Sequence, residues 1–148
     1  MYRKETQVLI TLISLILIPG IYTLYVYNKF IAGNLVILND FQFWGKRFLI
    51  LVPIMIVAMI IIHIVFAIVN KIVTNEDIPT KTDEMDKLIE LKALRISHWT
   101  YSLGFIMALA SQAIGMQSWV LLTILISSCF IAGITESIAK IFFYRKGI

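Results

Sequence analysis

The chain has 148 residues, of which 59% are apolar, and its mean hydropathy is +0.88. Soluble domains contain roughly half apolar residues and more charge than the 15% found here, so the composition excludes an ordinary water-soluble fold. The net charge of +4 is better explained by membrane orientation than by direct binding of nucleic acid. We therefore expect an integral membrane protein whose first partner is the lipid bilayer.

Charged residues leave three uncharged stretches of 23, 23 and 40 residues, long enough to cross a bilayer once, once and twice. The longest must be divided, and the polar segment 111–118, which contains Gly115, is the place for a turn. Segments in lipid must satisfy their own backbone amides, and no alternating pattern typical of barrel strands occurs. The sequence predicts an all-α, integral membrane four-helix bundle, a single domain over 1–148 with spans at about 7–27, 48–70, 96–113 and 119–143.

The positive-inside rule gives the orientation. With the N-terminus inside, the outer side holds only Lys29, Lys46 and Arg47. The cytoplasmic side then collects the other ten cations, Arg3, Lys4, Lys71, Lys81, Lys87, Lys92, Arg95, Lys140, Arg145 and Lys146. The three tryptophans, Trp44, Trp99 and Trp119, all fall at the edges of predicted spans, where the headgroup level favours them. Both termini are therefore predicted to be cytoplasmic.

The segment 74–95 is predicted to be a cytoplasmic linker followed by a helix. Pro79 and Thr80 to Thr82 indicate a turn, and no Gly or Pro follows before span 3, so the helix should continue into that span. Its charged residues are candidates for binding a partner: Asp83, Glu84, Asp86, Lys87, Glu90, Lys92 and Arg95. The alternative is that its apolar side, which includes Met85, Leu88 and Ile89, lies against the inner ends of the bundle or the lipid surface.

Two ionisable residues lie within the predicted spans. His63 and Glu136 are expected at similar depth in the cytoplasmic half, and Ser14 and Ser102 fall at comparable depths. One interpretation is an intramembrane polar layer for proton handling or cation binding. The other is that Glu136 pairs with Lys140 one helical turn away, while His63 forms a single hydrogen bond to a neighbouring helix.

Catalytic chemistry is not indicated. A zinc site needs three or four ligands, whereas the spans supply His63 and Glu136, with His98 at the interface. No P-loop, dinucleotide-binding motif or nucleophile elbow is present. The single cysteine, Cys129, excludes an intramolecular disulfide. We expect no catalytic residue, no cofactor and no metal ion.

Small residues recur every four positions in the second half of the chain. Cys129, Gly133 and Ser137 form one such series, and Gly104 and Ala108 form another in span 3. Ser128 and Ala132 run beside the first series, and Ser111 and Gly115 follow the second. Such patterns allow close helix approach, so spans 3 and 4 are expected to pack tightly, and Gly133→Leu should separate them. The same faces also favour a homodimer.

The stretch Asp83–Ile96 reads DEMDKLIELKALRI, and the chain closes on FFYRKG at 142–147. These two segments resemble a family of small four-span prokaryotic membrane proteins, classed as a domain of unknown function, that shows a D-E-x-D-x-L-I-x-L-K-x-x-R segment and an aromatic-Tyr-Arg-basic-Gly tail. The likeness covers roughly Asp83 to Gly147. It implies a plasma (inner) membrane location and, because some members are encoded beside helix-turn-helix regulators, a regulatory partner.

Two functions remain from these observations. The first is a non-enzymatic membrane protein that binds itself, another membrane protein or a cytoplasmic regulatory protein through the helix before span 3. The alternative is a small ion, proton or solute transport protein that uses the layer of His63 and Glu136. The first hypothesis is preferred because most of the sequence specificity outside the spans lies before span 3.

Overall fold

A computed structural model describes residues 2–77 and 83–147 of the chain. These residues form four long helices and two short helical segments, and the described part of the chain contains no strand. The elements are α1 (Tyr2–Val26), the π-helix η1 (Tyr27–Ile31), the 3-10 helix η2 (Leu35–Asn39), α2 (Phe41–Thr74), α3 (Glu84–Ala113) and α4 (Ser118–Lys146). The expected turn at Pro79 and the cation Lys81 lie outside the described residues. The predicted all-α class is confirmed.

Local chemistry explains where the helices begin and end. The Asp40 carboxylate accepts hydrogen bonds from the backbone N–H groups of Gln42 and Phe43, at 2.9 and 3.3 Å, and so caps α2. Asp83 starts α3 within a reciprocal capping box. The turn between α3 and α4 contains Gly115 at φ +80°, a conformation that glycine adopts without strain. Helix α3 thus runs unbroken from residue 84 to the interruption at which the sequence predicts a turn.

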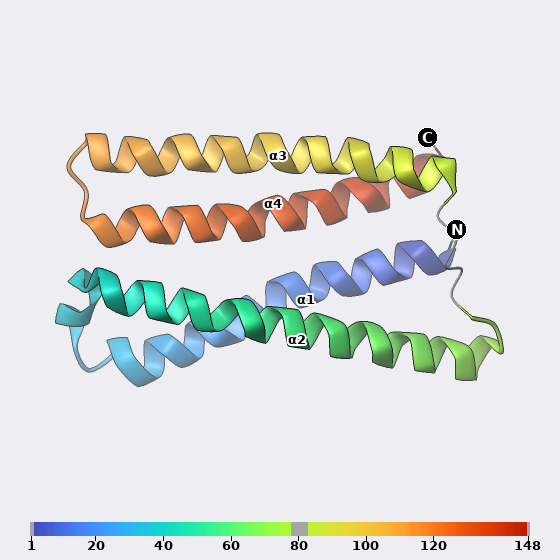
Figure 1. The fold of residues 1–148 in the computed structure, drawn as a ribbon, viewed down its shortest axis with the longest axis horizontal. Helices are drawn as coiled ribbons and strands as arrows, with labels where there is room; N and C mark the ends of the chain where they lie inside the picture. Colours follow the sequence, from blue (N-terminus) through green and yellow to red (C-terminus); the bar gives the residue numbers. More distant parts are fainter. Residues whose placement is uncertain (1, 78–82, 148) are drawn as a thin grey trace.

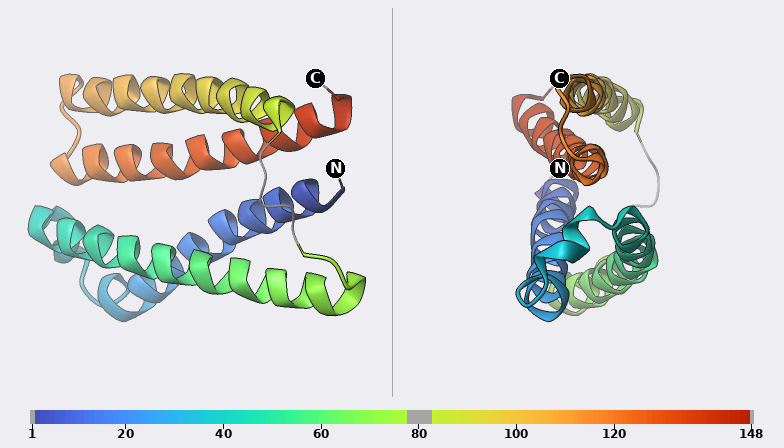
Figure 2. Two further views of the ribbon diagram at one scale, coloured as in Figure 1. Left: turned by 45° about the vertical axis from the view of Figure 1, so that its right-hand side comes forward. Right: turned by 90° about the vertical axis from the view of Figure 1, so that its left-hand side faces the viewer.

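The helices form two hairpins, α1–α2 and α3–α4, that lie along a common direction (Figure 1). Both chain termini, the end of α2 and the start of α3 lie at one end, which we call the terminal end; the opposite end, with segments 27–40 and 114–117, is the loop end (Figure 1). Helix α4 lies between α3 and the α1–α2 hairpin, as the two views of Figure 2 also show. The four helices therefore form an open, layered arrangement instead of closing around one axis.

The buried core is thin. Small side chains make up much of it, and Ile89 is the largest side chain that is fully buried among the described residues. Most large apolar side chains on the long helices are exposed, including nearly continuous runs on α2. Among the described residues, three helical segments are long and apolar enough to cross a membrane: Lys4–Ile31, Phe41–Thr74 and Ser118–Lys146. Helix α3 does not reach that level of hydropathy.

Candidate functional site

Asp86 of α3 contacts residues of α1 and α4 at the terminal end. Its carboxylate accepts a hydrogen bond from the Asp83 backbone N–H at 3.0 Å, pairs with the Lys4 ammonium group of α1, and accepts a hydrogen bond from the Tyr144 hydroxyl of α4. Burial alone raises the pKa of Asp86, but these hydrogen bonds and the charge of Lys4 outweigh burial and hold the pKa below its ordinary value of 3.8. Asp86 is therefore an ionised internal anchor, and its charge is not presented to a partner.

A second contact joins the same end of the molecule. The Arg145 guanidinium of α4 pairs with the Glu5 carboxylate of α1. Together with Lys4 and Asp86, this pair fixes the start of α1 against α4 and the start of α3. The ion pairs connect residues 82 and 140 positions apart in the chain, which explains why the sequence alone did not reveal them.

The other residues predicted to bind a partner have different surroundings. Asp83 caps α3 and accepts a hydrogen bond from the Glu84 backbone N–H at 2.7 Å. Lys92 is half-buried, with its ammonium group 5.8 Å from the centre of the Phe143 ring. The remaining four are exposed: Glu84, Lys87, Glu90 and Arg95.

The apolar residues of this part of α3 divide between two sides of the helix. Ile89 and Ala93 are completely buried, whereas Leu91 and Leu94 are 65% and 55% exposed. At 100° per residue the exposed residues fall on the side opposite the buried ones. We call this surface the docking face, and it consists of Glu84, Lys87, Leu88, Leu91, Leu94 and Arg95. Only part of the predicted apolar side therefore packs against the rest of the protein.

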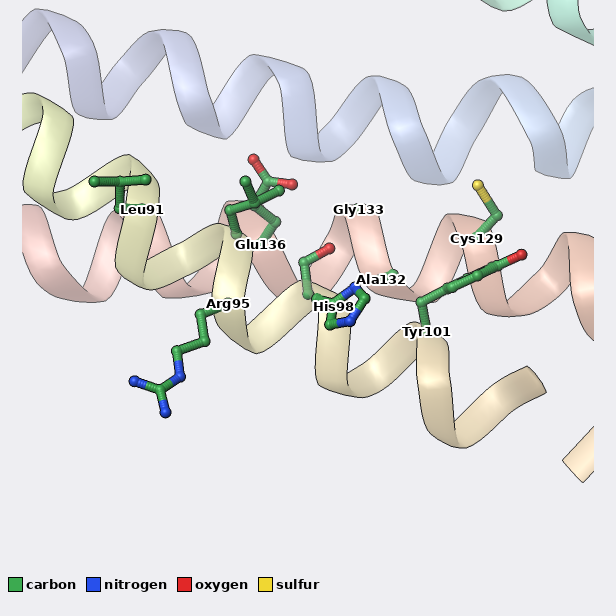
Figure 3. Close-up of a pocket in the computed structure, with 10 residues that line it drawn as sticks. Leu91, Arg95, His98, Tyr101, Cys129, Ala132, Gly133 and Glu136 are labelled. Carbon is green, nitrogen blue, oxygen red and sulfur yellow. The ribbon is translucent and has the colours of Figure 1, made fainter. Parts of the chain in front are cut away.

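A shallow pocket of about 700 Å³ adjoins the docking face between α3 and α4. Leu91, Leu94 and Arg95 line it together with His98, Tyr101 and Glu136, among others. Figure 3 shows Glu136 and Cys129 pointing toward the side on which α1 runs, while the guanidinium of Arg95 points the opposite way. The ionisable groups around the pocket thus diverge, and they do not converge on one reacting atom.

The structure gives each member of the predicted polar layer a partner outside that layer. The Glu136 carboxylate pairs with Lys140 at 2.7 Å, and the Nε2 atom of His63 lies 3.1 Å from the Thr11 hydroxyl of α1. The hydroxyls of Ser14 and Ser102 donate to carbonyls of their own helices, each at 2.8 Å. Among the described residues, no hydrogen bond or ion pair connects any two of these four side chains.

The contact between α3 and α4 uses the expected small-residue face of α3, but on α4 the closest approach is at Ser128, in the series next to that of Cys129. Gly104 lies against Ser128, so closely that an added Cβ would fall 2.3 Å from the Ser128 Cβ. Cys129 is exposed, and Gly133 faces Leu15 of α1, where an added Cβ would lie 3.4 Å from the nearest methyl group. The closest contact between α3 and α4 is therefore the one between Gly104 and Ser128, and Cys129 and Gly133 do not form it. Buried small residues line both helices: Ala93, Ser97, Gly104, Ala108 and Ser111 of α3, and Ser128, Ala132, Ser137 and Ala139 of α4.

The loop end contains a group of residues that the sequence did not indicate as a site. Trp44 of α2 stacks on Trp119 of α4, with ring centres 5.7 Å apart and planes 13° apart. The guanidinium of Arg47 lies 3.8 Å from the centre of the Phe30 ring. An apolar groove of about 760 Å³ begins beside these residues and runs between α1, α2 and α4. The sequence feature that could have indicated this site is the cluster of aromatic residues around Arg47. In the prediction of orientation, Arg47 served only as one of the three outer cations.

Within the described residues, no group of three or more His, Cys, Asp or Glu side chains is placed to hold a metal ion. The candidate sites are therefore the docking face at one end and the groove at the other. Comparisons with protein-family models, curated proteins and solved structures find no match to this chain.

Proposed function

We propose that this protein is a non-enzymatic, multi-pass membrane protein that binds a regulatory protein partner through the docking face of α3. The proposal includes four spans, with both termini and the docking face on the cytoplasmic side. The observation that carries it is the exposed apolar surface of Leu88, Leu91 and Leu94 on a helix that buries Ile89 and Ala93 on its opposite side.

The outer surface of α3 supports its assignment as a membrane span in addition to the other three helices. Leu103, Ile106 and Met107 are each at least 60% exposed, so they would face water unless lipid covered them. Two of the small residues that lower the hydropathy of this helix, Ser97 and Gly104, are buried, whereas His98 at the start of the predicted span is exposed. A hydropathy average combines both sides of the helix, whereas lipid contacts only the exposed one.

The charges of the docking face favour a protein over a lipid surface. A helix that binds anionic lipid carries mainly Lys and Arg on its polar side. Here Glu84 offsets Lys87, and Glu90 beside the face offsets Arg95. Alternating charges flanking a row of leucines are typical of a helix that lies in the apolar groove of another protein. The segment Asp83–Ile96 resembles a family in which some members are encoded beside regulators, and this resemblance implies the same kind of partner.

The transport alternative receives less support. Glu136 pairs with Lys140, and His63 lies within hydrogen-bond distance of Thr11. Among the described residues, no hydrogen bond or ion pair connects these two pairs into a continuous polar path. A proteoliposome flux assay between about pH 5.5 and pH 8 compares the two functions directly. Flux that disappears in a His63→Ala variant would favour transport.

The partner-binding proposal is tested with the double variant Leu91→Ser/Leu94→Ser. Its matched control is Ile72→Ser/Val73→Ser, which changes two exposed apolar residues of α2 at the same end of the molecule. Proteins that copurify from native membranes are quantified for the parent and both variants. We expect one partner to be lost from the α3 variant and retained by the control.

Circular dichroism should show equal helix content in all three proteins, because none of the four substituted side chains is buried. An unchanged set of partners in the α3 variant would contradict the proposal. If the variant instead turns a dimer into a monomer and no other protein is lost, the partner is a second copy of this chain.

A further inference from the structure

The groove at the loop end combines an apolar interior with a single cation at its border. Its walls come from three helices and include Leu15 and Val26 of α1, Trp44 and Arg47 of α2, and Thr123 and Phe130 of α4. We infer that this groove, here called the lipid groove, binds one acyl chain of an anionic glycerophospholipid whose phosphate is held by Arg47. The inference rests on the membrane placement in the proposed function and is independent of the protein partner.

The length of the lipid groove fits one leaflet of a bilayer. On α1 it extends from Leu15 to Val26, and on α4 from Thr123 to Ile134. Each stretch rises roughly 16 Å at 1.5 Å per residue, which is about half of a hydrocarbon core roughly 30 Å thick. The stacked pair Trp44 and Trp119 marks the headgroup level at one end of the groove. An acyl chain that starts at this level would therefore reach about the middle of the bilayer.

Arg47 is the cation that lines the lipid groove, and its side chain has no anionic partner among the described residues. Its Nε atom is buried and has no hydrogen-bond partner, and no carboxylate in the described part of the chain pairs with its guanidinium group. The guanidinium is held over the ring of Phe30 and lies 5.3 Å from the centre of the Phe43 ring. The hydroxyl of Tyr22 donates a hydrogen bond to the backbone carbonyl of Arg47 at 2.8 Å and so holds the backbone from which the Arg47 side chain extends. Guanidinium groups are able to bind phosphate oxygens through two parallel hydrogen bonds, and Arg47 lines the groove.

The charge around the lipid groove also favours an anion. Lys29, Lys46 and Arg47 lie within residues 27–47, a stretch of the chain that contains a single carboxylate, Asp40. The Asp40 side chain is occupied in capping α2, and within the described residues it forms no ion pair with any of the three cations. Local charge thus attracts a lipid with net negative charge more strongly than a zwitterionic one.

The test uses tryptophan quenching by brominated lipids in nanodiscs. A Trp99→Phe background leaves Trp44 and Trp119 as the reporters, and the lipids carry bromine near the carbonyl end of the acyl chain. Brominated phosphatidylglycerol is compared with brominated phosphatidylcholine. We expect about a fivefold preference for phosphatidylglycerol, the factor expected for one cation acting on an anionic lipid.

Two pairs of variants separate the proposed site from general effects. Arg47→Gln should abolish the preference, while Lys46→Gln removes an adjacent cation that does not line the groove and should retain it. Gly20→Leu fills the groove at a position where an added Cβ meets nothing within 4 Å, so it should weaken quenching by phosphatidylglycerol. Gly45→Leu, equally free of contacts but outside the groove, should not.

Native mass spectrometry of the unsubstituted protein gives a measurement that does not depend on the folding of any variant. Retention of one phosphatidylglycerol, and not of phosphatidylcholine, supports the inference. No preference in the parent protein, or equal loss in Arg47→Gln and Lys46→Gln, would overturn it. Because partner capture at the docking face is measured separately, failure of this experiment would leave the proposed function standing.

Discussion

The two hairpins of this protein are held together by different means. Helices α3 and α4 contact one another from end to end, through Asp86 and Tyr144, then Lys92 and Phe143, then small residues deeper in the pair. Helices α1 and α2 are rich in Ile, Leu and Val, and many of these side chains are exposed. The polar contacts between them lie far apart, with Thr11 and His63 toward one end and Tyr22 and Arg47 toward the other.

The difference follows from how helices associate in lipid. Apolar side chains gain little by leaving lipid for one another, so close packing of small residues is the main source of helix affinity there. The α3–α4 hairpin has such residues on facing sides, and the α1–α2 hairpin has very few. We therefore expect the α3–α4 hairpin to be the more stable unit, with the α1–α2 hairpin attached to it through α4.

The largest expected effect is that of Gly104→Leu. An added Cβ would lie 2.3 Å from the Ser128 Cβ and 3.5 Å from its Cα, and neither atom can move without shifting α4. We expect a loss of about 3 kcal/mol in the free energy of unfolding, at the upper end for overpacking. The change is measured by denaturant titration in detergent.

The matched control for this experiment is Gly133→Leu on α4. There the added Cβ meets only the flexible methyl groups of Leu15, at 3.4 and 3.8 Å. Its expected cost is under about 1 kcal/mol, because Leu15 can change rotamer. Equal losses in the two variants would show that the stable unit is not the α3–α4 hairpin.

Features of the fold that depend on local chemistry could be predicted from the sequence, whereas the choice of packing face could not. The turn at Gly115 and the continuity of α3 depend on local chemistry, namely glycine, helix caps and the absence of breakers, and both are visible in the sequence. The choice between Cys129 and Ser128 as the residue facing α3 is different in kind. Two small-residue series run side by side on α4, one position apart, and only the partner helix decides which of them is buried.

For the candidate sites as well, the sequence identified individual residues but not the contacts between distant segments. Asp83, Glu84 and Asp86 look equivalent as acidic residues in a first helical turn. Asp86 becomes a buried anchor only because Lys4 and Tyr144 meet it from distant parts of the chain. The lipid groove likewise requires the packing of three helices, so the sequence could indicate Arg47 as a cation but not the cavity beside it.

The second prediction concerns the terminal end, where both hairpins meet. Asp86→Asn removes the charge that pairs with Lys4, while the amide oxygen can still cap α3. We expect a loss of about 2 kcal/mol in the free energy of unfolding, as for a hydrogen-bonded charge that is mostly shielded from water. Glu84→Gln, in the same helical turn but exposed, should change stability by less than about 0.5 kcal/mol.

The same carboxylate predicts a dependence on pH. Because the pKa of Asp86 in the folded protein lies below its ordinary value of 3.8, the anchor contributes stability at higher pH and loses it as pH falls through the folded pKa. The parent should therefore lose its advantage over Asp86→Asn below about pH 4. A stability difference that is constant from pH 7 to acid would contradict this assignment.

The smallest expected effect lies within the α1–α2 hairpin, at the hydrogen bond between Thr11 and His63. The Nδ1 atom of His63 lies 2.7 Å from the Met59 carbonyl, which can only accept, so this nitrogen carries a proton and a neutral ring has Nε2 as an acceptor. The Thr11 hydroxyl then has one proton for two acceptors, Nε2 and the Gln7 carbonyl at 3.0 Å.

This competition should keep the coupling between α1 and α2 small. A double-mutant cycle with Thr11→Val and His63→Ala is expected to give a coupling energy of about 0.6 kcal/mol, the average for polar contacts between membrane helices. Thr135→Val, at a hydroxyl that donates to the Ile131 carbonyl of its own helix, provides the uncoupled control with His63→Ala. A coupling above about 2 kcal/mol would mean that the α1–α2 hairpin depends on this one polar contact, and would reverse the ranking of the two hairpins.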